Sequence, residues 1–319
     1  MALITPFDDF PIHQTAETLA VPSSSDRNHY DRYWFNGFSE EKDFLFEIGV
    51  GFYPNRHIMD AHFSISTAGK QYSYHASARM NPARYPINIG PISLEILEPM
   101  QKIRFSLKDP EKKLSCDLIF NAVTEPHLEP KSLMIEGTRK ILETSRFTQF
   151  GKWDGSIETE SGNLDLTKEY GTRDKSWGVR PVGEPEIGAP GKLNAEPGVY
   201  WCWIPINFGD TFTHFGTFED HDGNSTQLSA DLVEISNNEV IKPLNNISHK
   251  VDWIKGTRWS SGAQISAQEG DKKIEINAKA CGPRFHCKGI GYQHPEWGHG
   301  FWKGEEAVGY EVWDLNEIN

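Results

Sequence analysis

The segment "FLFEIGVGF", residues 44–52, carries an aromatic or aliphatic side chain at every second position. Successive side chains of an extended strand point to opposite sides, so these apolar groups all fall on one face. A helix would distribute the same groups around its circumference, and the alternation therefore predicts a half-buried β-strand. The residues on the apolar face are Phe44, Phe46, Ile48, Val50 and Phe52.

The same alternation recurs through most of the chain. It is found in ISLEIL (92–97), IRFSL (103–107), LSCDLIFNA (114–122), YWCWIPINF (200–208), FTHFGTF (212–218), QLSADL (227–232), IEINAKA (274–280) and AVGYEVWDL (307–315). Turn-forming clusters such as DPEKK and EGDKK separate these segments. Strands joined by turns on both sides of the chain centre predict an all-β fold of two antiparallel β-barrel or sandwich domains packed together. We place the N-terminal domain at residues 1–160 and the C-terminal domain at residues 161–319.

Two segments depart from this pattern. Residues 131–144, KSLMIEGTRKILET, have the best helical periodicity, and we expect one short helix there. Residues 180–198 hold four prolines and several glycines, a composition that neither a strand nor a helix sustains. We expect this second segment to be a long loop across the mouth of a barrel or between the domains.

Composition narrows the classes of partner. The formal net charge is -13, and so acidic a protein lacks the basic surface that nucleic acids and anionic membranes select. No run of about eighteen apolar residues occurs, so we predict no membrane span, and the N-terminus lacks the basic start of a signal peptide. The four cysteines are too scattered for a disulfide framework. We therefore expect a cytoplasmic protein with no nucleic-acid partner, and the sequence leaves its oligomeric state open.

The densest mixture of charge and aromatic surface is YGTRDKSWGVRP, residues 170–181. On a strand, Asp174 lies on one face while Arg173 and Trp177 lie on the other. An apolar barrel interior would raise the pKa of Asp174, so that the protonated carboxyl acts as a general acid while Trp177 faces a developing cation. The alternative is a salt bridge from Asp174 to Arg173 or Arg180 at a domain junction. In both cases we expect Arg173, Asp174 and Trp177 to be mostly buried.

A second polar stretch, GIGYQHPEWGHGFWKGE at residues 289–305, places His294, Glu296 and His299 within six residues. Imidazole and carboxylate groups are zinc ligands, but Pro295 and the glycines exclude the helical H-E-x-x-H arrangement. We therefore expect no metal at these residues. Two interpretations remain open: an acid/base or hydrogen-bonding set at a barrel mouth, or turn residues with a purely structural role.

A run of aromatic side chains occurs at residues 201–218, in the second half of the chain. Trp201 and Trp203 fall on one face of the predicted strand at residues 200–208, and His214 lies among the aromatic residues of the next strand. One face of these strands should line a ligand cavity or a sheet-to-sheet interface. The alternative is ordinary aromatic core, in which a histidine is more often a satisfied structural residue than a catalyst.

Four motifs together resemble a known superfamily. They are YWFNGFSEEKDFLFEIGVGFYPNRHIMDAHFS (33–64), RFTQFGKWDG (146–155), YGTRDKSWGVRP (170–181) and HPEWGHGFWKGE (294–305). In this order they resemble the hydroxyneurosporene synthase (carotenoid 1,2-hydratase) and AttH-like superfamily, and more narrowly an uncharacterised bacterial branch of it. The resemblance implies two lipocalin-like β-barrels packed together, with a hydrophobic ligand in a barrel or between the domains. In the hydratases an acidic residue protonates an alkene and aromatic residues stabilise the cation before water attacks; Asp174 and Trp177 are the matching residue types.

These observations lead to two functional hypotheses. The first is a cofactor-free enzyme that hydrates, isomerises or cyclises a terpenoid, steroid-like or polyketide molecule by acid catalysis. The second is a lipocalin-type carrier of a hydrophobic ligand without chemistry, and a zinc-dependent lyase is a weaker third. No nucleotide, flavin or serine-hydrolase motif occurs, so we expect no cofactor. The catalytic candidates are Asp174, Glu296, His294 and His299. The candidates for substrate binding are Tyr170, Arg173, Trp177, Trp201, Trp203, His214 and Trp297.

Overall fold

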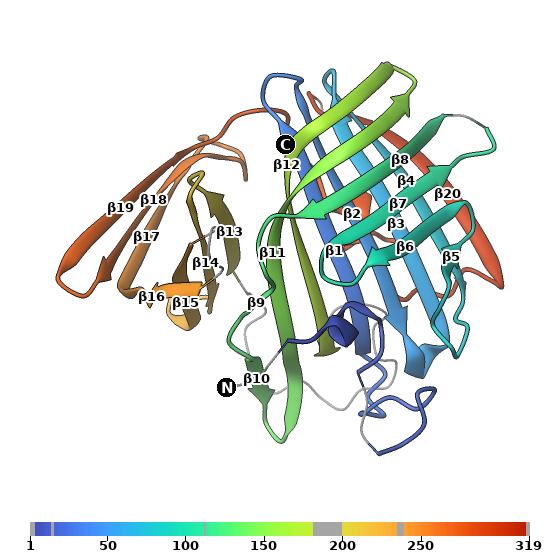
Figure 1. Cartoon of the computed structure of the whole chain (residues 1–319), viewed down its shortest axis with the longest axis horizontal. Helices are drawn as coiled ribbons and strands as arrows, with labels where there is room; N and C mark the ends of the chain where they lie inside the picture. Colours follow the sequence, from blue (N-terminus) through green and yellow to red (C-terminus); the bar gives the residue numbers. More distant parts are fainter. Residues whose placement is uncertain (1–3, 14–15, 112, 181–199, 235–238, 317–319) are drawn as a thin grey trace. The chain divides into compact units, whose positions relative to one another are not determined.

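The computed structural model describes residues 4–13, 16–111, 113–180, 200–234 and 239–316. In these ranges the protein is all-β, as the alternation predicts (Figure 1). Helix is limited there to three 3-10 turns: η1 (Pro6–Asp9), η2 (Pro54–Arg56) and η3 (Cys287–Ile290). Within the same ranges, no helix has the length and apolar character that a membrane crossing requires.

The chain divides into two compact units, Met1–Ala189 with Gly282–Ile318, and Pro190–Cys281. The first unit is built on one 13-stranded antiparallel sheet, in the order β20-β4-β3-β2-β1-β12-β11-β8-β7-β6-β5, with β9 and β10 both paired to β11. Its strands are β1 (His29–Ser39), β2 (Phe44–Tyr53), β3 (Ile58–Thr67), β4 (Lys70–Arg79), β5 (Ile87–Ile89), β6 (Ile92–Glu98), β7 (Lys102–Lys108), β8 (Leu114–Ala122), β9 (His127–Leu128), β10 (Ser132–Glu136), β11 (Arg139–Thr159), β12 (Gly162–Val179) and β20 (Glu306–Asp314).

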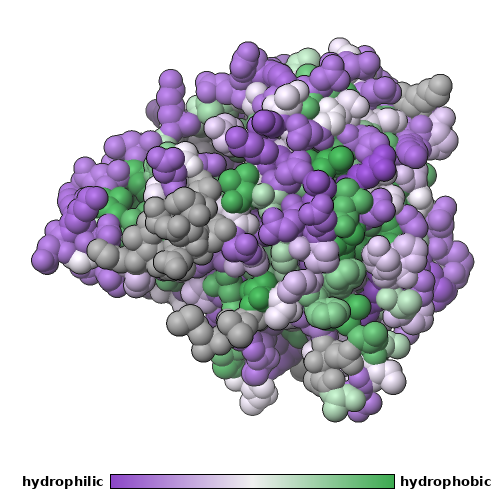
Figure 2. All heavy atoms as spheres, viewed as in Figure 1, coloured by the Kyte–Doolittle hydropathy of each residue, from purple (hydrophilic) through white to green (hydrophobic). Residues whose placement is uncertain are grey.

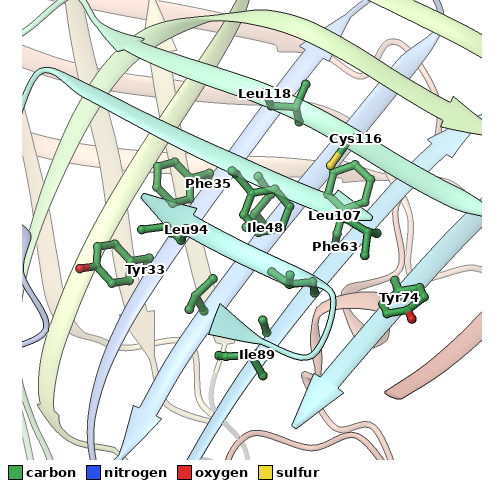
Figure 3. Close-up of a cluster of buried hydrophobic side chains, with 14 of the residues drawn as sticks. Tyr33, Phe35, Ile48, Phe63, Tyr74, Ile89, Leu94, Leu107, Cys116 and Leu118 are labelled. Carbon is green, nitrogen blue, oxygen red and sulfur yellow. The ribbon is translucent and has the colours of Figure 1, made fainter. Parts of the chain in front are cut away.

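This sheet curls into a nearly closed barrel whose inner face is apolar (Figures 1 and 3). Its two ends meet where Gly90, next to β5, packs beside Val308 of β20. The alternating side chains of residues 44–52 all belong to one buried cluster that fills the interior, together with Phe35, Phe63 and Phe105. Full burial of a side chain of this size contributes about 1.5–3 kcal/mol, so the alternation directs each strand's apolar face inward.

The outer face of the same strands is polar, yet on β3 and β4 it is also buried. Residues 286–302, the covering segment, lie against it and satisfy its polar groups. Gln71 donates to the carbonyl of His286 at 2.9 Å, and Ser77 donates to the carbonyl of Phe301 at 3.1 Å. The backbone N–H of Gly300 donates to Asp60 at 2.7 Å. Buried polar groups are tolerated when they are hydrogen-bonded, and these contacts fix the covering segment on the sheet.

The second unit contains two smaller antiparallel sheets. One is formed by β13 (Tyr200–Asn207), β14 (Thr211–Glu219), β15 (Ser225–Glu234) and β16 (Glu239–Pro243); the other is formed by β17 (Asn245–Trp253), β18 (Ser260–Glu269) and β19 (Lys272–Lys279). They share an apolar core of Phe215, Ile265 and Ile276 with Cys202 and Ile204. The predicted alternation of β13 is confirmed, because Cys202 and Ile204 face this core while Trp201 and Trp203 point to the other side.

Three expectations differ from the structure or lie outside it. The boundary placed near residue 160 falls in the tight turn between β11 and β12, two strands that pair along their length, and β20 returns to the first unit to pair with β4. The helix expected at residues 131–144 is wrong, since this segment forms β10, a turn at Gly137 with φ 59°, and the start of β11. The loop expected at residues 180–198 lies outside the described residues, apart from Arg180.

Hydrophilic residues dominate the face of the molecule seen in Figure 2, and hydrophobic residues gather there in smaller patches. This distribution agrees with the net charge of -13. Single exposed apolar side chains are normal on a protein surface and do not by themselves mark a site. The functional site is therefore sought among buried polar groups.

Candidate active site

One row of cross-strand neighbours runs over the outer face of the barrel. Asp174 of β12 pairs with Trp34 of β1, and Trp34 pairs with Gly49 of β2. Gly49 in turn pairs with His62 of β3, and His62 pairs with His75 of β4. Directly opposed residues on one face have Cβ atoms about 5 Å apart. The sheet thus brings an acid, an indole and two imidazoles from distant parts of the sequence into one line.

Asp174 is an unusual carboxyl on this row. Its side chain is buried, and burial raises its pKa to about 6. The charge of Arg146 acts in the opposite direction, and that of Glu129, which is bound to Arg146 at 2.7 Å, raises the pKa further. No hydrogen bond to Asp174 is found in the part of the chain that the structure describes. Burial and the lack of donors favour the protonated form, and the arginine charges nearby favour the ionised form, so both forms are accessible near neutral pH.

Glu47 of β2 is a second carboxyl on the outer face. Burial raises its pKa to about 7, and the charge of Asp174 acts in the same direction. The indole Nε1–H of Trp34 donates to Glu47 Oε2 at 3.2 Å, and both side chains are half-buried. Trp34 is therefore the direct neighbour of both acids. With pKa values of about 6 and about 7, Asp174 and Glu47 are partly protonated in the neutral range.

Arg32 occupies the space that Gly49 leaves open. A Cβ atom at Gly49 would lie 2.0 Å from Arg32 Nη2, so any larger residue at this position requires the guanidinium to move. The guanidinium is buried and donates to the carbonyl of Ile290, in the covering segment, at 3.1 Å. Its charge lowers the pKa of both Glu47 and Asp174, against the effect of burial. Arg32 thus sets an upper limit on how far the two carboxyls become neutral.

The substitution Gly49→Ala should destabilise the protein by about 1–3 kcal/mol, the usual cost of overpacking a filled interior. The new methyl group would displace the Arg32 guanidinium from the Ile290 carbonyl. Urea unfolding followed by circular dichroism measures the change. Gly216→Ala is the control, because the nearest atoms to its Cβ would lie at 3.5 Å. Equal stability of both variants would show that Arg32 adjusts without cost.

His299 does not lie where a proton donor is needed. It is fully buried, and burial followed by the charges of Arg32 and Arg180 holds its pKa well below the ordinary value. Its Nδ1 accepts from Arg180 at 3.1 Å, and its Nε2 faces the carbonyl of Ile290 at 2.8 Å. The imidazole is therefore neutral and donates through Nε2. In this structure His299 positions Arg180 and the covering segment.

His294, Glu296 and Trp297 lie at the other end of the row. The Nδ1 atom of His294 accepts hydrogen bonds from the backbone N–H groups of Glu296 and Trp297, with N···N distances of 3.0 and 2.9 Å. Its Nε2 faces Glu311 of β20 at 3.0 Å. Glu296 is exposed and lies 3.7 Å from Lys303, so it is not a carboxyl in a dry site. Trp297 is buried, and its ring stacks on the imidazole ring of His75, with the ring centroids 5.5 Å apart.

Arg173 and Trp177 point into the end of the barrel, on the face opposite to Asp174. The predicted division of the motif between two faces is confirmed, but the expected position of Asp174 inside the barrel is wrong. Arg173 binds Asp9 at 2.7 Å, so its predicted salt bridge with Asp174 does not form. Trp177 stacks on His13, with ring centroids 3.8 Å apart. The N-terminal segment thus engages the inward face of β12 and leaves the outward face to Asp174.

The remaining sequence candidates are dispersed. Tyr170 is half exposed and stacks on Phe38 at the surface of the first unit. Trp201 and Trp203 lie side by side on one face of the second unit, with ring centroids 6.4 Å apart and an interplanar angle of 15°. His214 lies on the same face of that sheet and is fully buried. None of these four side chains belongs to the row that carries Asp174.

Sequence reasoning missed several residues of this face: Arg32, Trp34, Glu47, His62, His75 and Glu311. A signal for them was present. The polar positions of β3 and β4 alternate with apolar ones but are Asp, His, Ser and Gln rather than the long charged residues of an open surface. Such a pattern indicates a polar face that other protein covers, because small polar groups can be satisfied by hydrogen bonds when buried.

The comparisons with known proteins agree with this fold. The fold is similar to the crystal structure of a putative AttH from Nitrosomonas europaea, with TM-score 0.52 and 15% identity over 74% of this chain and 76% of that chain. It is also similar to kievitone hydratase from Nectria haematococca, with TM-score 0.51 and 13% identity over 84% of this chain and 85% of that chain. At these identities the similarity establishes the fold only, which supports the predicted AttH-like architecture.

No curated protein matches the sequence. A family model, by contrast, matches almost all of it, over residues 4–319. Its description, "Family of unknown function (DUF8625)", assigns no activity. The chain therefore belongs to the family of unknown function DUF8625.

Proposed function

We propose that the protein is a cofactor-free hydratase that adds water to a carbon–carbon double bond of a hydrophobic small molecule, with Glu47 and Asp174 as its acid and base. The observation that carries this proposal is the pair of carboxyls with raised pKa values beside one indole. Alkene protonation needs a neutral carboxyl in a poorly solvated place. Among the described residues, Glu47 and Asp174 are the carboxyls whose pKa values burial raises above the ordinary value. The similarity to kievitone hydratase is consistent with the proposal.

The two carboxyls differ in their surroundings. The charges of Arg146, Arg32 and Arg180 all favour the ionised form of Asp174, so we assign the role of base to Asp174 and the role of acid to Glu47, whose pKa burial raises to about 7. Glu47 transfers its proton to one alkene carbon and becomes a carboxylate, and the other carbon becomes a cation. The oxygen of a water molecule bonds to the cation, and the proton it releases passes to Asp174. Transfer of that proton back to Glu47 through water restores the pair, so one water is added in each cycle.

Trp34 takes the part that the sequence suggested for Trp177. Its indole is the direct neighbour of Asp174 and binds Glu47, so its ring can face the developing cation. An aromatic face beside a desolvated positive charge stabilises it by about 2 kcal/mol. Isomerisation would share the first step and end when the cation loses a proton from a neighbouring carbon, whereas cyclisation would proceed when a second double bond of the substrate attacks the cation. Asp174, which is buried next to Trp34, is the base that takes the proton when water attacks. The same base would remove a proton from the cation in an isomerisation, so the two reactions are separated by whether the product gains a water.

The carrier alternative finds less support. A lipocalin-type carrier holds its ligand inside a barrel, but the interior here is filled by side chains such as Phe35, Ile48, Phe63 and Leu118, each less than 2% exposed (Figure 3). We therefore assign the ligand to the outer face, next to Trp34. The test is to incubate the protein with terpenoid, steroid-like and polyketide alkenes in ¹⁸O-labelled water. Mass spectrometry should detect a product that has gained one labelled water; isomers of unchanged mass from every alkene that the protein binds would contradict the proposal.

The rate of hydration should depend on pH with a bell shape. Below about pH 6 both carboxyls are protonated and the base is lost, and above about pH 7 both are ionised and the acid is lost. Because the two groups interact, the limbs report the pair rather than either residue. The measurement is kcat/KM between about pH 4 and 9. A rate that keeps rising through the alkaline range would exclude a carboxylic acid as the proton donor.

A further inference from the structure

A cavity of about 360 Å³ opens at the β20 end of the covered face. The covering segment and β20 line it, with His294, Glu296, Glu311 and Trp313 among the lining residues. His75 lies directly behind this wall. Its side chain is fully buried, and its Nε2 atom has no hydrogen-bond partner within the described ranges. An unpaired buried nitrogen is costly, so its presence beside a cavity calls for an occupant.

The hydrogen bonds around His75 assign its tautomer. Its Nδ1 lies 2.8 Å from His62 Nδ1, so one of the two imidazoles donates to the other. His62 Nε2 lies 3.8 Å from the carboxylate of Asp60, which is buried beside it. A proton on His62 Nε2 is stabilised by that charge, and His62 Nδ1 is then the acceptor. The other carboxylate nearby, Glu311, is 32% exposed and already accepts from His294 Nε2 at 3.0 Å, so the buried charge of Asp60 decides the tautomer. His75 therefore donates through Nδ1 and leaves the lone pair of Nε2 facing Glu311.

The distance from Glu311 to His75 Nε2 distinguishes a hydrogen bond from two ligands of one metal ion. The Oε2 atom of Glu311 lies 3.6 Å from His75 Nε2. This is longer than an N–H···O hydrogen bond, which spans about 2.7–3.2 Å. Two donor atoms that share one zinc ion at about 2.1 Å with a tetrahedral angle lie about 3.4 Å apart. The separation fits two ligands of one metal ion better than it fits a hydrogen bond.

His294 belongs to the same group but plays another part. One nitrogen or oxygen atom each of His75, His294 and Glu311, of the kind that binds metal ions, lies within 4.8 Å of the other two. The Nδ1 atom of His294, however, already accepts two backbone N–H groups, so its Nε2 carries the proton. Nε2–H donates to Glu311 at 3.0 Å, a normal hydrogen-bond length. His294 therefore orients the Glu311 carboxylate, as residues adjacent to metal ligands commonly do.

We propose that the cavity binds a divalent transition-metal ion of the zinc class, with His75 Nε2 and the Glu311 carboxylate as ligands. His294 positions Glu311, and the Asp60–His62 pair holds His75 in the ligating tautomer. Water from the cavity completes the coordination. Imidazole with carboxylate is a ligand set that suits zinc and its neighbours. From the sequence we expect no metal, and the proposed site differs from that expectation. The site takes no part in the proposed hydration, because β2 and β3 separate His75 from Trp34.

The test is calorimetric titration of the full chain with Zn²⁺ after treatment with EDTA. We expect one ion per chain at this site. His75→Gln and Glu311→Gln should each abolish this binding, and His294→Gln should weaken it by about 10–100-fold, the usual effect of a group that orients a ligand. Zn²⁺ should also raise the thermal unfolding midpoint of the wild type, because a ligand of the native state stabilises it.

His249→Gln is the matched control. His249 Nε2 lies 3.0 Å from Glu219 in the second unit, so it is a His–Glu pair at hydrogen-bond distance. This variant should bind Zn²⁺ like the wild type. Because buried His75 could be needed for folding, Glu311→Gln provides an independent test, with a side chain 32% exposed. Absence of binding at millimolar Zn²⁺, or undiminished binding by folded Glu311→Gln, would overturn the proposal.

Discussion

Glu47→Gln and Asp174→Asn should each reduce hydration turnover by at least about 100-fold, the lower range for loss of general acid or base catalysis. Each substitution keeps the shape of the side chain and removes its ability to exchange a proton. The amides should leave substrate affinity nearly unchanged, so the loss should appear in kcat rather than in KM. Asp117→Asn is the control, since that carboxylate lies on the exposed surface of β8 and pairs with Arg104. Wild-type turnover in either amide variant would remove that residue from the mechanism.

The same variants offer a readout that does not require the substrate. A carboxyl whose pKa is raised on folding binds its proton more tightly in the native state, so native stability falls as pH rises through the folded pKa. The shift of Asp174 from 3.8 to about 6 corresponds to about 3 kcal/mol lost at alkaline pH. Asp174→Asn should therefore be more stable than the wild type toward urea at about pH 8, and this difference should shrink below about pH 4.

Asp9→Asn should destabilise the protein by about 3–5 kcal/mol, because it leaves the guanidinium of Arg173 buried without its counter-charge. Arg173 is 1% exposed and lies 2.7 Å from Asp9. Its remaining strong partner in the barrel is the amide oxygen of Gln149, at 2.7 Å from Nε, which carries no charge to offset it. Urea unfolding measures the loss at neutral pH.

A comparison with an exposed ion pair separates the effect of burial on stability from the effect of losing an ion pair. Asp117→Asn breaks another Asp–Arg pair, 2.7 Å from Arg104 Nε, but both side chains are more than 40% exposed. Exposed pairs contribute about 0–1 kcal/mol, so this variant should change stability little. If the two substitutions had equal effects, the cation of Arg173 would have to reach solvent or another carboxylate once Asp9 is neutral.

Much of the fold follows from period-2 alternation, because the apolar face of each strand must be buried whatever its partner. The alternation of residues 44–52, for example, matches the interior of the barrel. Local pattern could not show which face of β12 turns inward. Both faces of this strand carry charge, and the inward choice depends on Asp9, which binds Arg173 across 164 residues of sequence.

The candidate site was predicted only in part for the same reason. The mixed composition of residues 170–181 singled out Asp174, but its partners lie on other strands. Glu47 interrupts an apolar segment and looks like an ordinary outward residue of a half-buried strand. Only the register of β1 and β2 places it beside Trp34. Likewise, His75 and Glu311 meet because β20 pairs with β4, two strands of the first unit between which the whole second unit lies in the sequence.

The return of β20 to β4 has a consequence for how the protein is made. On the ribosome, β4 emerges early, whereas the covering segment and β20 emerge only after the whole second unit. At a synthesis rate of about 5–20 residues per second, the outer edge of β4 waits at least about ten seconds for its neighbour. During that time it is an unpaired strand edge with a row of uncovered polar groups, the kind of surface that associates with other chains. Nascent chains that stall within the second unit should therefore be the ones that recruit chaperones.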